Sequence, residues 1–188
     1  QDYFTNSLNL AEQQNKKRAV EEKIKVAEFN NNNADYEAEI NIRKDAISAI
    51  REIEEDSIIP NESPITLQKQ NFKIGNLYAL KKDYDSAIPY YEESIIEAEK
   101  KGDLEVKKDA LMRYSEVQFS RGDEEKAVAA INEFKNVVDE LYAKKVQEIS
   151  RAARFSKSIA EQQNRITSLE SDRELSRSKY QLTQERNK

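Results

Sequence analysis

Residues 67–101 and 107–142 repeat one pattern of apolar, small and polar positions, forty residues apart. Each copy has apolar residues at helical spacing, a polar turn, and a second helical stretch with a small residue followed by bulky ones. The shared positions are Gly75, Tyr78, turn 82–84, Ala87, Tyr91 and Ser94 in the first copy, and Ser115, turn 121–123, Ala127, Ile131 and Phe134 in the second. The pattern predicts two helical hairpins that pack closely at the small residues. Such a duplication is typical of a helical solenoid, which presents a surface rather than a catalytic pocket.

The region 1–56 predicts another helical pair, which we interpret as a degenerate first repeat. A helix over residues 5–29 follows from an apolar stripe and from Thr5 or Asn6 as the cap. The stripe consists of Leu8, Ala11, Val20, Ile24 and Ala27. Four asparagines, Asn30–Asn33, should end this helix, because Asn favours turns.

A second helix is predicted to begin at Asp35 and to end near Glu55. Its apolar face consists of Tyr36, Ile40, Ile47 and Ile50. Glu39 stands where the other copies have their close-packing Ala. Residues 57–63 predict a loop. Ser63-Pro64 is expected to cap the next helix. Pro89 predicts a bend or a late start in the helix that begins at Tyr84.

After Leu141 the apolar spacing changes, which predicts a long polar helix from about Lys144 towards Lys188. Its seam consists of Ile159, Gln162, Ile166 and Leu169. This seam could pair two chains in a parallel coiled coil, with Gln162 fixing the register. Alternatively, residues 144–160 fold back over the last hairpin and bury Val146, Ile149 and Phe155. The domains expected are therefore 1–56, 64–143 and 144–188.

Composition supports the all-α fold class and excludes several functions. Only three Gly and three Pro occur in 188 residues, and 36% of residues are charged against 37% apolar. The chain has no Cys and no His, which removes the commonest metal ligands and the commonest general base. We therefore expect no metal site, no cofactor and no enzyme activity. The net charge of −5 argues against nucleic acid as a partner.

The two hairpins resemble tetratricopeptide repeats. The residues that carry the resemblance are Ile74-Gly75, Tyr78, Asp83-Tyr84, Ala87 and Tyr91, then Leu111, Tyr114, Gly122-Asp123, Ala127 and Phe134. Two positions depart from the family: Asn71 replaces a large apolar residue, and Gln118 replaces the usual Tyr. The resemblance implies a short superhelix of helical hairpins whose concave face binds a peptide or protein.

The concave face is expected to come from the first helix of each hairpin. Its residues would be Lys69, Phe72, Asn76, Ala79, Asp109, Met112, Arg113, Glu116 and Phe119. Apolar residues among polar ones suit a peptide, and Asn76 and Arg113 could hold its backbone or a carboxylate. Alternatively, these apolar side chains pack on neighbouring helices of the same chain.

Residues 134–142, 160–166 and 169–175 are similar to the tetratricopeptide sensor regions of membrane-bound histidine kinases from Bacteroidetes-type bacteria. This resemblance implies an extracytoplasmic input region that relays through its last helix, with membrane contact only through segments outside this chain. The start at Gln1 suits a processed or excised piece. The alternative is a stand-alone scaffold that assembles other proteins, with a cytoplasmic location.

Overall fold

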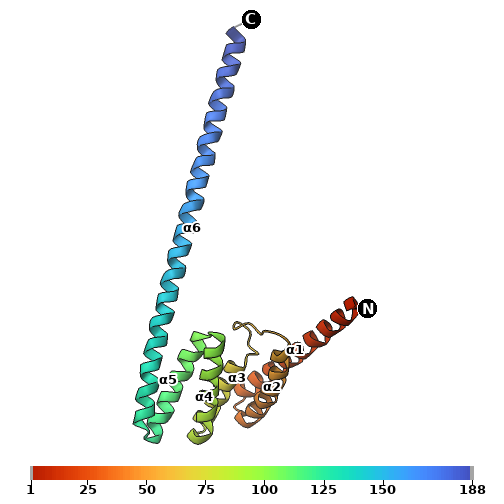
Figure 1. Ribbon diagram of the computed structural model, residues 1–188, viewed down its shortest axis with the longest axis vertical. Coiled ribbons are helices and arrows are strands. Elements are labelled where there is room, and N and C mark those ends of the chain that lie inside the picture. Colours follow the sequence, from red (N-terminus) through yellow and green to blue (C-terminus); the bar gives the residue numbers. More distant parts are fainter. Residues whose placement is uncertain (1, 187–188) are drawn as a thin grey trace. The chain divides into compact units, whose positions relative to one another are not determined.

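A computed structural model describes the backbone of residues 2–186 and the side chains of residues 14–186. This described part forms six helices and no strand, which confirms the all-α fold class (Figure 1). The helices are α1 (Asp2–Asn32), α2 (Tyr36–Asp56), α3 (Leu67–Leu80), α4 (Tyr84–Lys101), α5 (Leu104–Arg121) and α6 (Glu124–Arg186). The chain divides into two compact units, Gln1–Leu141 and Tyr142–Lys188.

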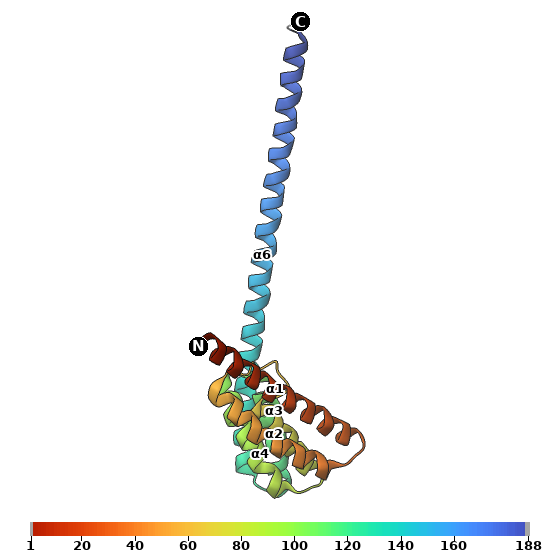
Figure 2. The same ribbon diagram turned by 90° about the vertical axis from the view of Figure 1, so that its right-hand side faces the viewer.

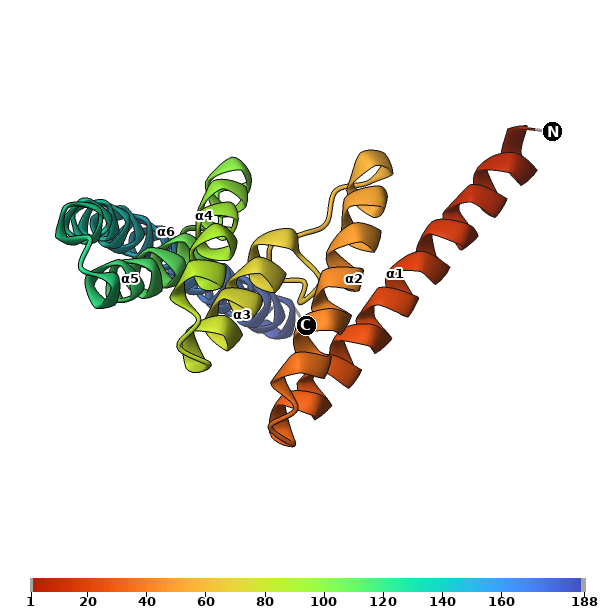
Figure 3. The same ribbon diagram turned by 90° about the horizontal axis from the view of Figure 1, so that it is seen from below.

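In the first unit, successive helices lie side by side in chain order (Figure 3). α1 and α2 run in opposite directions around a tight turn (Figure 2), and α3 packs on both α4 and α5. The unit is therefore built from helical pairs that each contact the next pair along the sequence.

Aspartates cap the start of α2, α4 and α5, and glycines end α4 and α5. The side chains of Asp35, Asp83 and Asp103 each accept a hydrogen bond from a backbone N–H three residues later, at 3.2 Å. Such caps satisfy N–H groups that have no partner inside the helix. Gly102 and Gly122 have φ values of 66° and 84°, the left-handed conformation that stops a helix without a Cβ clash. The predicted turns thus lie where the sequence pattern placed them.

The close packing predicted at small residues is confirmed. Ala87 and Ala127 are buried. Gly75 on α3 faces Tyr91 on α4 so closely that a Cβ there would lie 2.9 Å from two ring carbons. The repeat pattern also predicts that the bulky residues after each Ala fill the space between hairpins. This prediction is wrong for Ile131, whose side chain is 52% exposed. Leu111, Ala130 and Val137 instead form the buried contact between α5 and the start of α6.

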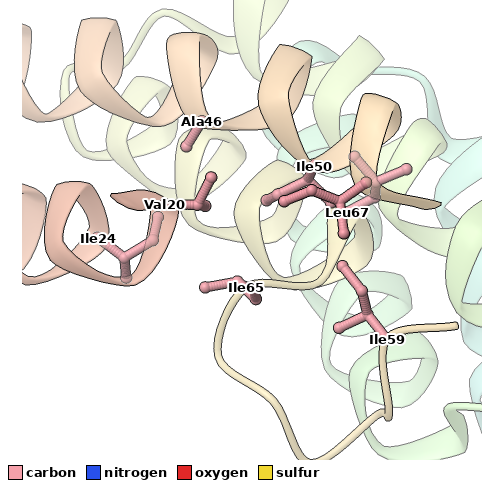
Figure 4. Packing of buried hydrophobic residues seen from close by; sticks show 8 residues of the cluster. Val20, Ile24, Ala46, Ile50, Ile59, Ile65 and Leu67 are labelled. Carbon is pink, nitrogen blue, oxygen red and sulfur yellow. The ribbon is translucent and has the colours of Figure 1, made fainter. Parts of the chain in front are cut away.

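The first helical pair closes through a cluster that also recruits the loop before α3. Figure 4 shows side chains from α1, α2 and the loop converging. The cluster consists of Val20, Ile24, Ala46, Ile50, Ile53, Ile59, Ile65 and Leu67. The predicted stripe from Val20 to Ala27 is buried, whereas Leu8 and Ala11 lie outside the described side chains. The prediction of Thr5 or Asn6 as cap is wrong, because α1 already begins at Asp2.

Glu39 is buried although it replaces a small residue. Its Oε1 accepts a hydrogen bond of 2.7 Å from Arg43 Nε, and both side chains are at most 2% exposed. Arg43 Nη1 donates to Gln70 Oε1 at 2.7 Å, and Asn31 Nδ2 donates to Glu39 Oε2 at 2.7 Å. The Asn-rich end of α1 therefore anchors a buried polar network, and α1 continues through Asn32.

The loop before α3 is longer than predicted. Helix α3 begins at Leu67 after Thr66, so the prediction of Ser63-Pro64 as helix start is wrong. Gln70 Nε2 donates to the Pro64 carbonyl at 2.6 Å, which holds this residue in the turn. Pro89 lies inside α4, and that helix still begins at Tyr84 rather than late.

Helix α6 begins at Glu124, not near Lys144, and continues to Arg186. It includes the whole second unit described here. The side chains expected to be buried by a fold-back are exposed: Val146 by 45%, Ile149 by 65% and Phe155 by 70%. The change in apolar spacing after Leu141 therefore does not mark the start of a helix.

Candidate functional site

A groove of about 420 Å³ lies between α3, α4 and α5. Each helix contributes residues spaced along one face. The lining consists of Asn76, Ala79 and Leu80 from α3, Tyr84 and Tyr91 from α4, and Arg113, Glu116, Val117 and Ser120 from α5.

Tyr91 and Asn76 form the polar floor of this groove. The Tyr91 hydroxyl donates to Asn76 Oδ1 at 2.8 Å. Burial raises the pKa of the Tyr91 phenol, so it remains a donor at any physiological pH. Because its oxygen accepts from Tyr91, Asn76 has its Nδ2 amino group left to donate to a ligand.

Arg113 and Glu116 supply opposite charges on the α5 side. Arg113 Nη1 donates to Glu116 Oε2 at 2.9 Å, and both side chains are more than half exposed. The hydrogen bond to Glu116 raises the pKa of Arg113, which stays cationic. A guanidinium has five N–H donors, so the pair can still bind a carboxylate or a peptide carbonyl from a ligand.

The apolar part of the groove includes one side chain that is open to solvent. Leu80 is 65% exposed, and it lines the groove together with Tyr84 and Val117. An accessible Leu beside fixed hydrogen-bonding groups can receive one apolar side chain of an extended segment.

The structure brings together some of the predicted site residues and separates others. Asn76, Ala79, Arg113 and Glu116 line the groove. Lys69 does not, because its ammonium donates to the backbone carbonyls of Asn61 and Ser63 and secures the loop before α3.

The predicted aromatic and thioether residues also lie outside the groove lining. Phe72 packs beside Tyr91, with ring centroids 6.2 Å apart, and so supports the floor from behind. Met112 and Phe119 on α5 are 43% and 68% exposed. Asp109 is exposed as well, and its Oδ1 lies 3.4 Å from Lys108 Nζ. The alternative that these apolar residues pack on neighbouring helices therefore holds for Phe72, but not for Met112 or Phe119.

The sequence pattern did not identify five lining residues of the groove: Leu80, Tyr84, Tyr91, Val117 and Ser120. A signal existed for the two on α5, because Arg113, Glu116, Val117 and Ser120 follow the i, i+3, i+4, i+7 spacing of one helical face. The predicted face on α5 began at Asp109 and therefore included Met112 and Phe119 in place of Val117 and Ser120.

The predicted seam residues lie on α6 in the second unit. Ile159, Ile166 and Leu169 are exposed by 45%, 56% and 61%, and Gln162 is exposed as well. Among the described residues, no helix is both long and apolar enough to cross a membrane. In the same part of the chain, no cluster of three or more acidic, His or Cys side chains is arranged to hold a metal ion.

A scan against protein-family models, a search of curated proteins and a search of solved structures found no match to this chain.

Proposed function

We propose that this chain is the signal-input and protein-interaction region of a bacterial two-component sensor histidine kinase on the extracytoplasmic side of the membrane. In this proposal, residues 1–143 form a superhelix of the tetratricopeptide type, and the groove between α3 and α5 binds a peptide or a protein segment. The last helix relays the bound state towards the output module, with a second copy of the chain as its partner. The chain itself performs no catalysis.

The observation that carries the binding step is the chemistry of the groove. Asn76 offers an amide donor fixed by Tyr91, and Arg113 adds a cation beside the accessible Leu80. These groups fit an extended peptide that carries an acidic residue next to an apolar one. Its affinity would rest on few contacts, since the groove is short.

The relay step is supported by how α5 is attached to α6. Lys107 Nζ on α5 lies 2.7 Å from Glu133 Oε1 on α6 and 2.9 Å from Glu99 Oε2 on α4. Leu111 of α5 packs in one cluster with Ala130 and Val137 of α6. A ligand that shifts α5 therefore acts directly on the first part of α6, and this helix continues without a break to Arg186.

The binding step is tested by panning a random peptide library on the chain and measuring the selected peptide by fluorescence anisotropy. Arg113→Glu and Leu80→Asp should each weaken binding at least ~10-fold, because each places a carboxylate against the ligand. Glu125→Lys, an exposed charge change at the start of α6, is the matched control and should bind normally. If both groove variants bind the peptide as tightly as the wild type does, this groove is not the binding site.

The sensor context has a separate test in the coding sequence that follows Lys188. An apolar span of about 20 residues there supports the sensor, because this length crosses a bilayer. A stop codon at that point favours the stand-alone scaffold instead. The relay is tested by hydrogen exchange of residues 124–141, which should change when the selected peptide binds.

A further inference from the structure

A second, smaller groove of about 220 Å³ lies between α2 and α4, with α3 beneath it. It shares no residue with the groove described above. Its lining consists of Lys44, Ile47 and Arg51 from α2, Asn71 from α3, and Pro89, Tyr90 and Glu93 from α4.

Asn71 is the unexpected residue in this groove. Its side chain is 3% exposed, and its Nδ2 has no hydrogen-bond partner in the structure. A buried amide donor without a partner costs free energy, so such a group calls for an explanation. The corresponding residue of the next sequence repeat, forty positions later, is the buried Leu111.

Two cations line the same groove. Lys44 Nζ donates to the Tyr78 hydroxyl at 2.8 Å and lies 5.8 Å from the centroid of the Tyr90 ring. Arg51 Nη2 donates to Glu93 Oε1 at 2.8 Å. An ammonium has three N–H donors and a guanidinium five, so both groups have donors left for an anion.

The matching groove of the next repeat differs from this one at several positions. It lies between α4 and α6, and it contains Leu111 where the first has Asn71. Glu92 takes the place of Lys44, and Ala130 takes that of Tyr90. One architecture thus carries two different chemistries. The first groove has an amide, two cations and the carboxylate of Glu93. The second has an apolar residue in place of the amide, the carboxylates of Glu92 and Glu133, and one cation, Lys126.

We propose that the groove around Asn71 binds a small organic carboxylate. Asn71 Nδ2 and Lys44 Nζ donate to the carboxylate oxygens, and Ile47, Pro89 and the Tyr90 ring contact a short apolar chain. The volume of 220 Å³ lies below the range of about 300–1,000 Å³ typical of drug-sized ligands, which favours an acid of a few carbons. This site is separate from the proposed peptide groove, because the two grooves have no lining residue in common.

The test is a titration of the isotope-labelled chain with butyrate, followed by nuclear magnetic resonance. The Asn71 side-chain amide signals should shift and saturate, with a Kd on the order of 1 mM for so few contacts. If an ordered water alone occupies the groove, these signals will not move at ~10 mM butyrate, and the proposal is wrong.

Variants distinguish this site from weak surface binding. Asn71→Leu, which installs the residue of the next repeat, and Lys44→Met should each weaken butyrate binding at least ~10-fold. Lys126→Met removes a cation from the matching groove and should leave binding unchanged. Circular dichroism verifies folding, and Lys44→Met, on a partly exposed side chain, keeps the test valid if Asn71→Leu misfolds. Normal binding to Lys44→Met would overturn the proposal.

Two further probes define the ligand class. Inorganic phosphate should bind more weakly than butyrate, because it cannot use the apolar wall; tighter phosphate binding contradicts the proposal. N-acetylvaline imitates the end of a peptide chain and should also bind more weakly, since it exceeds the short apolar chain for which the groove has room. Tighter binding of N-acetylvaline would assign the groove to peptide ends instead of free acids.

Discussion

Gly75 and Tyr91 fix the distance between α3 and α4 and shape the floor of the candidate groove. A Cβ at Gly75 would lie 2.9 Å from ring carbons Cδ1 and Cε1 of Tyr91. The ring is fully buried, packs against Phe72, and reaches Asn76 with its hydroxyl. It has little room to move, because three neighbours hold it.

Gly75→Ala should therefore destabilise the chain despite better helix propensity. The substitution gains about 1 kcal/mol of propensity, while overpacking of a filled core costs roughly 1–3 kcal/mol. We expect a net loss of up to ~2 kcal/mol in urea unfolding, together with weaker peptide binding as Tyr91 shifts.

A double-mutant cycle isolates this contact. Adding Tyr91→Leu to Gly75→Ala should give a smaller loss than the sum of the two single losses, because the smaller side chain makes room for the new methyl. Strict additivity would mean that the clash with Tyr91 does not cause the loss.

Glu39 and Arg43 form a buried ion pair, and the cost of breaking it depends on how it is broken. Arg43→Met or Glu39→Gln leaves one buried group without its charged partner, which typically costs about 3–5 kcal/mol. The double variant Glu39→Ala/Arg43→Met removes both charges and should cost less than Arg43→Met alone. The double variant still leaves Gln70 Oε1 without its donor, so its stability should not exceed that of the wild type. Urea midpoints of the three variants verify this order, and a double variant less stable than both single ones would contradict it.

Gln118 is buried at 0% exposure, and neither of its amide atoms has a partner in good hydrogen-bond geometry. Replacing it with Met keeps the shape and removes two unpaired polar groups. Gln118→Met should therefore stabilise the chain by about 1–3 kcal/mol.

Gln68 is the comparison residue. It is equally buried, and its Oε1 also has no partner, but its Nε2 donates to Asp103 at 3.0 Å. Gln68→Met should destabilise by about 1–3 kcal/mol. Thermal unfolding of both variants gives the comparison, and a loss of stability in Gln118→Met would show that this amide is satisfied in solution.

Local pattern predicted the elements whose cause is local. The aspartate caps, the glycine turns and the small residues Ala87 and Ala127 all follow from short-range sequence rules. The pattern could not predict that Glu39 is buried, because Asn31, which donates to it, belongs to α1, and because its neighbour Arg43 is held by Gln70 of α3. The groove was predicted only in part. Asn76 and Arg113 lie on helical faces that the periodicity predicts. Lys69 instead donates to the loop before α3, whose path no periodicity encodes. The function, the partner and the location remain proposals.

Lys107 predicts how stability responds to alkaline pH. Burial lowers its pKa, but hydrogen bonds to Glu133 and Glu99 outweigh this effect, so the pKa lies above its ordinary value of 10.5. The stabilisation is fully present below the unfolded pKa and is lost as the pH rises through the folded one. The free energy of unfolding should thus fall above about pH 10.5 more steeply in the wild type than in Lys107→Met. Lys126→Met, an exposed lysine, is the control, and identical slopes for wild type and Lys107→Met would contradict the prediction.

The seam on α6 predicts a weak self-association. Ile159, Ile166 and Leu169 are exposed on one continuous helix, yet the seam spans about two heptads, and such a short coiled coil is marginal alone. We therefore expect the chain to sediment as a monomer or a weakly associating dimer at micromolar concentration. Gln162→Leu removes the polar seam position and should tighten the dimer by about 1 kcal/mol or more, while Gln163→Leu, one position off the seam, should have little effect. A tight wild-type dimer, or equal effects of the two substitutions, would show that another surface pairs the chains.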